Sequence, residues 1–217
     1  NMDLVSQNLL LSSGGKKDST YIDDVFSTYL WKGTEATLNI NNGIDLAGEG
    51  GMTWIKSRGT SDLQRNVVFD TERGAGKAIF TNATLAQSVD TTRLSAFNSN
   101  GFTLGNASDV NGLFDLSSWS YRKAPGFFDI VKYTGNDANR TIAHSLGCVP
   151  GLILIKGLDA GHHWQVYHRD IGNTKTLKLN DTDPASTSGT AWNNTSPTAT
   201  HFSLGTEAGL NANSQNF

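Results

Sequence analysis

The sequence has few of the residues that mark several common protein classes. It contains one cysteine, Cys148, so neither an internal disulfide nor a cysteine metal cluster is expected. Cys148 stands among apolar neighbours, a setting that predicts a small buried side chain rather than a nucleophile. Only 2 methionines and 4 prolines accompany 23 glycines, and Asn, Ser and Thr are abundant. This composition is typical of short strands joined by frequent turns, so a mostly β protein is expected.

Strong charge and long apolar runs are also absent. The net charge is -3, and basic residues nowhere run together as a phosphate-binding patch, which argues against a nucleic-acid partner. No apolar run approaches the roughly 18 to 20 residues needed to cross a bilayer. The segment from Asn1 to Val5 lacks the basic and apolar parts of a secretion signal. We therefore expect a soluble chain with no membrane insertion and no export signal.

Familiar catalytic motifs are missing as well. The sequence has no glycine loop followed by Lys-Ser or Lys-Thr, no Gly-x-Ser-x-Gly and no His-Glu-x-x-His. Asp70 and Glu72, beside Arg73, offer the paired acids that a glycan hydrolase needs. A later segment that otherwise parallels this one, His168 to Gly172, does not keep the pair, so a solvated turn with a local ion pair is the favoured interpretation. Neither enzymatic activity nor a cofactor is predicted.

What the sequence does contain is one stretch that occurs twice, at a spacing of about 100 residues. The first copy contains Phe26, Trp31-Lys32-Gly33, Ile40, Trp54-Ile55-Lys56, Val68-Phe69-Asp70, Ala96-Phe97-Asn98, Phe102-Thr103-Leu104-Gly105 and Val110-Asn111. The second contains Phe128, Tyr133-Thr134-Gly135, Ile142, Leu154-Ile155-Lys156, Val166-Tyr167-His168, Ala191-Trp192-Asn193, Phe202-Ser203-Leu204-Gly205 and Leu210-Asn211. Two copies of one folding unit are predicted, and their lack of a catalytic signature favours a binding or assembly protein over an enzyme.

Strand signals recur within both copies. The clearest fall at Phe26–Leu30, Thr37–Ile40, Met52–Lys56, Val67–Asp70, Phe102–Leu104, Gly151–Lys156, Trp164–His168 and Phe202–Leu204. Only the segment Ala83–Ser88 has the character of a helical turn. We predict an all-β fold of two tandem, homologous β-sandwich or jelly-roll-like repeats, over residues 21–124 and 125–217. A short extended arm over residues 1–20 precedes them.

The two ends of the chain differ from the repeated part. The arm holds an apolar group followed by a polar, linker-like segment, so it is predicted to dock on a partner. Its candidate contact residues are Leu4, Val5, Leu9, Leu10 and Leu11. Copy one closes with a strand at Phe114–Lys123, which copy two lacks. That lack would leave a sheet edge exposed, which we expect a neighbouring subunit, the arm or residues outside this chain to cover.

The densest polar and aromatic segment runs from Gly161 to Asp170. On a strand, His162 and His168 lie about 20 Å apart, too far to share one metal, so no metal site is predicted. Aromatic side chains flanked by amide and charged groups can stack on sugars or peptides. The candidate ligand-binding residues are therefore Trp164, Tyr167, His168 and Trp192. The competing interpretation, in which Trp164 and Tyr167 pack inside the fold, is favoured because both align with strand residues of copy one.

Several phrases of the sequence resemble one known family. They are Tyr21 to Leu30, Asn42 to Leu46, Gly50 to Lys56, Phe69 to Gly74, Phe97 to Gly105 and Phe128 to Gly135. The family consists of uncharacterised repeat proteins encoded mainly by tailed bacteriophages, and the resemblance covers nearly the whole chain from residue 3. Its members are known chiefly as virion structural proteins of the tail-fibre or head-decoration kind, without established catalytic residues.

The resemblance implies a virion structural protein that is made in the host cytoplasm. In this hypothesis the arm anchors the protein on capsid or tail proteins, and the repeats assemble as a symmetric homo-oligomer, with a trimer favoured. The alternative is a lectin-like or receptor-binding module in which exposed aromatics such as Trp31, Trp164 or Trp192 contact host surface glycans. Burial of these three tryptophans would argue against that alternative.

Overall fold

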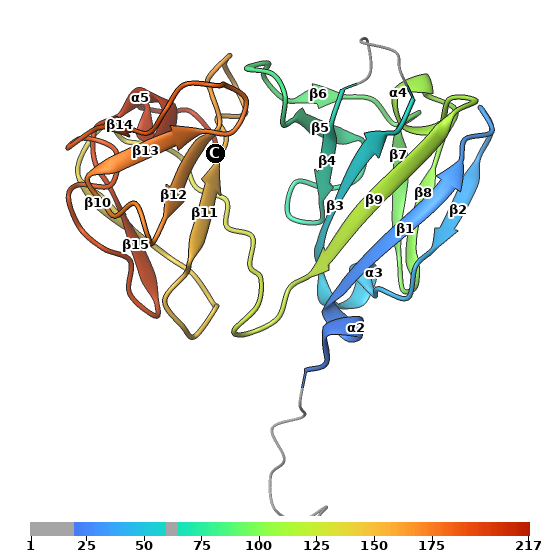
Figure 1. Ribbon diagram of the computed structural model, residues 1–217, viewed down its shortest axis with the longest axis horizontal. Coiled ribbons are helices and arrows are strands. Elements are labelled where there is room, and N and C mark those ends of the chain that lie inside the picture. The colour runs from blue at the N-terminus through green and yellow to red at the C-terminus, as the bar shows by residue number, and fades with distance from the viewer. Residues whose placement is uncertain (1–19, 60–64) are drawn as a thin grey trace, which may run out of the picture.

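The computed structural model describes residues 20–59 and 65–217, which form two β units placed side by side (Figure 1). We refer to residues 21–124 as repeat 1 and to residues 125–217 as repeat 2. The expected all-β fold is confirmed. The apolar residues of the arm, Leu4, Val5, Leu9, Leu10 and Leu11, lie outside the described residues.

Repeat 1 is a sandwich of two antiparallel sheets. The larger has the strand order β1-β9-β3-β4-β5-β6, formed by β1 (Phe26–Lys32), β9 (Asp115–Arg122), β3 (Gly51–Ser57), β4 (Val67–Asp70), β5 (Lys77–Phe80) and β6 (Ser88–Val89). The smaller has the order β2-β8-β7, formed by β2 (Leu38–Asn41), β8 (Gly101–Leu104) and β7 (Leu94–Asn98). The first and last strands of the repeat, β1 and β9, are thus neighbours in one sheet.

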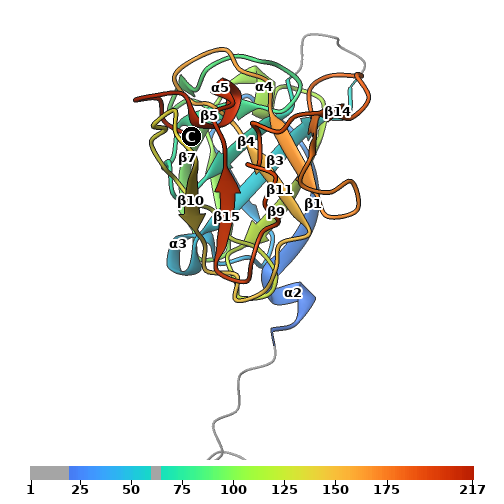
Figure 2. The ribbon, with the colours of Figure 1, turned by 90° about the vertical axis from the view of Figure 1, so that its left-hand side faces the viewer.

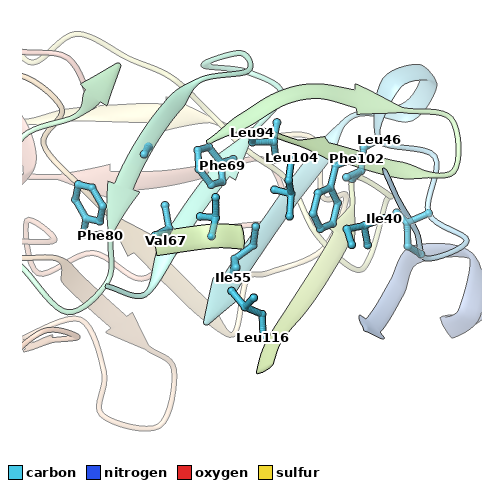
Figure 3. Packing of buried hydrophobic residues seen from close by; sticks show 13 residues of the cluster. Ile40, Leu46, Ile55, Val67, Phe69, Phe80, Leu94, Phe102, Leu104 and Leu116 are labelled. Carbon is cyan, nitrogen blue, oxygen red and sulfur yellow. The ribbon is translucent and has the colours of Figure 1, made fainter. Parts of the chain in front are cut away.

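The core of repeat 1 fills the space between these sheets (Figure 3). Ile55 and Phe69 from the large sheet meet Leu94, Phe102 and Leu104 from the small one, and all five are fully buried. In β3, buried residues alternate with partly buried or exposed ones, because successive side chains of a strand point to opposite faces. Full burial of one such side chain contributes about 1.5–3 kcal/mol.

Repeat 2 follows the same plan with fewer strands. Its sheets are β10-β15 and β11-β12-β13-β14, formed by β10 (Arg140–Ala143), β15 (His201–Leu204), β11 (Leu152–Ile155), β12 (Gln165–His168), β13 (Lys175–Lys178) and β14 (Ser186–Thr187). Figure 2, seen from the side of repeat 2, shows β10 beside β15. β3 and β11 occupy matching places in the two copies, but in residues 20–59 and 65–217 β3 lies inside its sheet and β11 does not. β11 is an edge strand.

Helix is confined, in the described residues, to single turns. These are α2 (Ile22–Val25), α3 (Leu46–Glu49), α4 (Ser108–Asn111) and α5 (Ala208–Asn211). The prediction of a helical turn at Ala83–Ser88 is wrong. The backbone of this segment is used by repeat 2 instead: Thr84 O accepts a hydrogen bond from Lys156, and Gln87 N–H donates to Leu158 O.

The predicted burial of Cys148 is also wrong. Its side chain is exposed, because Cys148 lies in the loop between β10 and β11 and not in a strand. Apolar neighbours in sequence do not bury a loop residue unless the loop packs against another element.

Candidate functional site

Trp164, the tryptophan of the Gly161–Asp170 segment, lies where the two repeats meet. Trp164 is 6% exposed and packs against Val68 and Ile79 of repeat 1. Its indole Nε1 donates a hydrogen bond of 2.8 Å to Phe80 O, so one side chain supplies both an apolar and a polar link. Met52, Trp54, Leu154 and Leu158 pack around this cluster. We call it the inter-repeat cluster.

Lys156 makes a second link between the repeats. Its Nζ donates to Thr84 O of repeat 1 at 3.1 Å and to His162 O of repeat 2 at 2.8 Å. Both partners are neutral carbonyl groups, and the residue is only 4% exposed. Burial lowers the pKa of Lys156 to about 8, because the protonated amine loses its hydration. Its counterpart in repeat 1, Lys56, is exposed, so comparison of the copies did not reveal this role.

A cavity of about 530 Å³ opens beside the inter-repeat cluster. Apolar residues of both repeats line it, among them Met52, Trp54, Leu154, Trp164 and Phe202. Figure 1 shows the elements that bound it: β11 lies on the side of repeat 2 nearest repeat 1, and the chain joining the repeats runs between them. Two buried polar atoms of lining residues, Trp54 Nε1 and Thr81 Oγ1, have no hydrogen-bond partner in the described part of the chain.

The remaining candidate ligand-binding residues do not form a surface face. Tyr167 is 4% and Trp192 is 1% exposed, and their rings meet edge to face at 5.6 Å in the core of repeat 2. The indole of Trp192 donates to Lys175 O at 3.0 Å. His168, on the opposite face of β12, is partly exposed. The candidate stacking surface is therefore corrected, because Trp164, Tyr167 and Trp192 are all buried. Trp164, just before β12, and Tyr167, on β12, lie in different buried clusters, and Trp192 packs against Tyr167.

Trp31, the third tryptophan of the glycan hypothesis, packs against the core of repeat 1. Its ring lies 6.3 Å from that of Phe102, edge to face. The three tryptophans thus contribute to packing, and none of them forms a flat exposed platform.

The paired acids Asp70 and Glu72 lie in different environments, and only Asp70 is buried. Asp70 and Arg73 are 6% and 7% exposed, and Arg73 Nε lies 2.5 Å from Asp70 Oδ2. The guanidinium also donates to Lys77 O at 2.8 Å and to Val68 O at 3.1 Å. The Arg73 guanidinium thus has a carboxylate to balance its charge and an acceptor for each of these N–H groups. Since Val68 and Asp70 belong to β4 and Lys77 belongs to β5, these bonds join β4 to β5. The expected ion pair is present, but it is buried and not solvated. Glu72 is partly exposed and pairs with Lys123 Nζ at 2.7 Å instead.

Comparison with known proteins supports the duplication. A family model described as "Domain of unknown function (DUF7483)" matches residues 21–127 and, a second time, residues 116–217. The chain belongs to the DUF7483 family. The two matches share residues 116–127, which hold most of β9 and the passage into repeat 2. No curated protein and no solved structure matches the chain.

One buried asparagine is used identically in both DUF7483 repeats. Asn111 Nδ2 donates to Ala36 O and Gly105 O at 2.6 and 2.7 Å. Asn211 Nδ2 donates to Ala138 O and Gly205 O, each at 2.8 Å. In each case the side-chain Oδ1 accepts a backbone N–H, at 3.0 Å for Asn111 and 3.1 Å for Asn211. This shared network explains why both asparagines occur at the same place in the two copies.

The described part of the DUF7483 chain has neither a metal-binding cluster of side chains nor a helix suited to a membrane. Among residues 20–59 and 65–217, no three His, Cys, Asp or Glu side chains gather in a way that could hold a metal ion. No helix in those residues combines the length and the apolar character that a bilayer crossing requires.

Proposed function

We propose that this protein is a non-enzymatic structural component of a tailed-bacteriophage virion, of the tail-fibre or capsid-decoration kind. The bacteriophage setting is supported by the sequence resemblance, which spans nearly the whole chain. The structural role is supported by one observation: Trp164, a candidate ligand-binding residue, is buried between the two repeats and bonds one to the other. Lys156 makes a second link of this kind.

Two repeats joined in this way suit a virion component, because the position of one repeat then fixes the position of the other. The connection between the repeats is short, since β9 ends at Arg122 and Ala124 already pairs with Phe128 of repeat 2. Short connections and buried contacts restrict relative movement of neighbouring domains. In the proposed role, the repeats project from, or cover, the surface to which the arm attaches.

Attachment through the arm belongs to the same proposal. Residues 1–20 would bind a capsid or tail protein through Leu4, Val5, Leu9, Leu10 and Leu11, and the repeats would assemble as a homo-oligomer, with a trimer favoured. An apolar segment that lacks a core of its own gains stability only by burial against a partner.

Immunogold labelling of purified virions tests the proposal. Antibody against the repeats is expected to label the tail or the shell of intact particles. Deletion of residues 1–20 should remove the label while the purified protein keeps its β-sheet circular dichroism spectrum. Absence of the full-length protein from the particles would contradict the virion role. Continued attachment of the shortened protein would contradict only the role of the arm.

A further inference from the structure

Repeat 2 begins a strand that repeat 1 has in full. In repeat 1, Leu116 near the start of β9 pairs with Trp31 of β1. In repeat 2, Phe217 pairs with Tyr133 in the same way: Phe217 N–H donates to Tyr133 O at 2.9 Å, and Tyr133 N–H donates to Phe217 O at 3.2 Å. The two rings are stacked, with centroids 5.2 Å apart. Phe217 therefore corresponds to Leu116.

The same correspondence holds on the other side of the incipient strand. In repeat 1, Arg58 N–H, just beyond β3, donates to Asp115 O at 2.8 Å. In repeat 2, Leu158 N–H, just beyond β11, donates to Asn216 O at 2.8 Å. Asn216 and Phe217 thus hold the first two positions of a counterpart of β9, with a neighbour on each side.

The edge of β11 continues the line that these two residues start. In the described residues β11 forms a ladder with β12 only, in which Ile153 faces Tyr167 and Ile155 faces Gln165. Gly151 O accepts from Arg169 N–H on the same side. Because hydrogen-bonding direction alternates along an antiparallel strand, the backbone groups of Leu152, Leu154 and Lys156 point away from β12. They point to the side on which β3 is paired with β9 in repeat 1.

The cavity described above lies along this open edge. Its walls include β11 on one side and residues 128–133, the counterpart of β1, on the other. In repeat 1, the corresponding strands β3 and β1 are separated by one strand, β9. We call the space between β11 and residues 128–133 the strand slot.

The geometry points to a binding function for the strand slot: it accepts one extended, apolar peptide strand that runs on in line with Phe217, antiparallel to β11. β9 has eight residues, and Asn216 and Phe217 match its first two, so six positions, or about 20 Å, remain to be filled. This inference deepens the proposed structural role and rests on it for its use in the particle.

The slot selects for an apolar strand on its inner face. In repeat 1, Thr53 pairs with Phe69 and hydrogen-bonds Ser120 of β9 at 3.2 Å, so a polar strand residue is satisfied there. The residue at the same place in repeat 2 is Ile153, which pairs with Tyr167. A serine placed opposite Ile153 would find no hydrogen-bond partner there, whereas an aliphatic side chain needs none.

The outer face of the slot is apolar for a different reason. In repeat 1 the outer face of β9 carries Trp119, which is partly exposed. In repeat 2 the corresponding side faces repeat 1, where Met52, Trp54 and Trp164 line the cavity. A strand in the slot is therefore covered on both faces, and such a strand is mostly apolar, because a buried polar group is costly unless it finds a hydrogen-bond partner.

Entry in line with Phe217 is favoured over a strand from a second copy. Asn216 and Phe217 already occupy both ladders at the entrance of the slot, through Leu158 and Tyr133. A strand from another chain would have to displace this pair or begin beyond it. A strand continuous with Phe217 extends the existing ladders without displacing them.

Amide hydrogen exchange on the purified full chain tests the inference. The probe is a six-residue extension fused after Phe217, with the sequence Val-Val-Ile-Val-Val-Thr. Without it, the amides of Leu152, Leu154 and Lys156 should exchange at least about 100-fold faster than those of Ile153 and Ile155. With it, exchange at the first three should slow at least about tenfold, while exchange at the other two should not change.

A matched extension provides the control. It carries proline at its first and third residues, whose N–H groups would donate to Lys156 O and Leu154 O, and it should give no protection. Equal exchange at Leu154 with the valine and proline extensions would overturn the inference. Protection of Leu154 in the unextended chain that appears only as dimers form would assign the slot to a second copy, which also overturns it. Because no particle is involved, absence of the protein from virions would leave this result unchanged.

Discussion

Polar side chains inside this protein hold backbone segments in place. Asn111 and Asn211 each satisfy two carbonyl groups and one N–H of a neighbouring loop, and Arg73 satisfies a carboxylate and two carbonyls. Such groups contribute little net stability while paired, but a partner left unpaired in the interior is costly. Each of these residues is therefore expected to be sensitive to substitution.

Asn111→Ala and Asn211→Ala should each destabilise the protein by about 3 kcal/mol. Each asparagine is itself fully buried, and each change leaves two carbonyls and one N–H, most of them partly buried, without their partner. The cost is about 1–3 kcal/mol for each group that stays unsatisfied, offset where water reaches the exposed ones. Urea denaturation followed by circular dichroism measures the loss as a lower transition midpoint.

Asn213→Ala is the control, since Asn213 is exposed and lies only two residues from Asn211. Its effect should stay within about 0.5 kcal/mol. If Asn111→Ala and Asn211→Ala each lower the unfolding free energy by less than about 1 kcal/mol, water must replace the lost hydrogen bonds.

The strands could be predicted well from the sequence, because alternation and β-branched or aromatic residues act locally. Expected strands at Val67–Asp70 and Phe102–Leu104 match β4 and β8. Prediction failed where a segment depends on the other repeat. Ala83–Ser88 has the composition of a helical turn, yet its Thr84 carbonyl binds Lys156, which lies 72 residues further along the chain.

The contact between Lys156, which directly follows β11, and the Ala83–Ser88 segment should make stability depend on pH. The pKa of Lys156 is about 8 in the folded protein and the ordinary value is 10.5. Below about pH 8 Lys156 is protonated in both the folded and the unfolded state, so the full cost of burying its charge is subtracted from the unfolding free energy. Between pH 8 and 10 the folded state releases a proton that the unfolded state retains, so the unfolding free energy rises with pH. The rise should amount to about 2 kcal/mol.

Lys156→Met is the matched variant for this measurement, because it keeps a long side chain and removes the charge. Urea denaturation at pH 8, 9 and 10 should show the rise in the wild type and not in the variant. Burial raises the pKa of Tyr121 and Tyr133, which weakens the fold above pH 10, so the difference between the two proteins is the quantity to compare. Parallel curves for both proteins would refute the assignment to Lys156.

The molecule as a whole consists of two sandwiches that share an apolar contact. Val68 and Ile79 lie on the outer face of the large sheet of repeat 1, and Trp164 covers them from repeat 2. An apolar outer face would be a liability on an isolated sandwich, because exposed patches promote association. Covering this face makes the stability of each repeat depend on the other.

Trp164→Ala should therefore uncouple the repeats. The change removes a buried indole and its hydrogen bond to Phe80 O, at a cost of about 3–5 kcal/mol. We expect a lower urea midpoint and a transition that splits or broadens as repeat 2 unfolds first. Leu113→Ala, at a residue that is 65% exposed, should change the midpoint very little. A single, unshifted transition for Trp164→Ala would mean that the contact contributes nothing to stability.

The sequence by itself determined the duplication, the all-β class and the position of most strands, because each follows from repetition or from alternation over a few residues. Only the tertiary structure decided the role of Trp164, Tyr167 and Trp192, which share one aromatic chemistry and lie in different buried layers. The sequence predicted an open sheet edge in repeat 2, but only the structure located it at β11, the counterpart of the inner strand β3. The physical reason is that burial and pairing depend on which distant segments reach a strand, and neighbours in sequence do not record that.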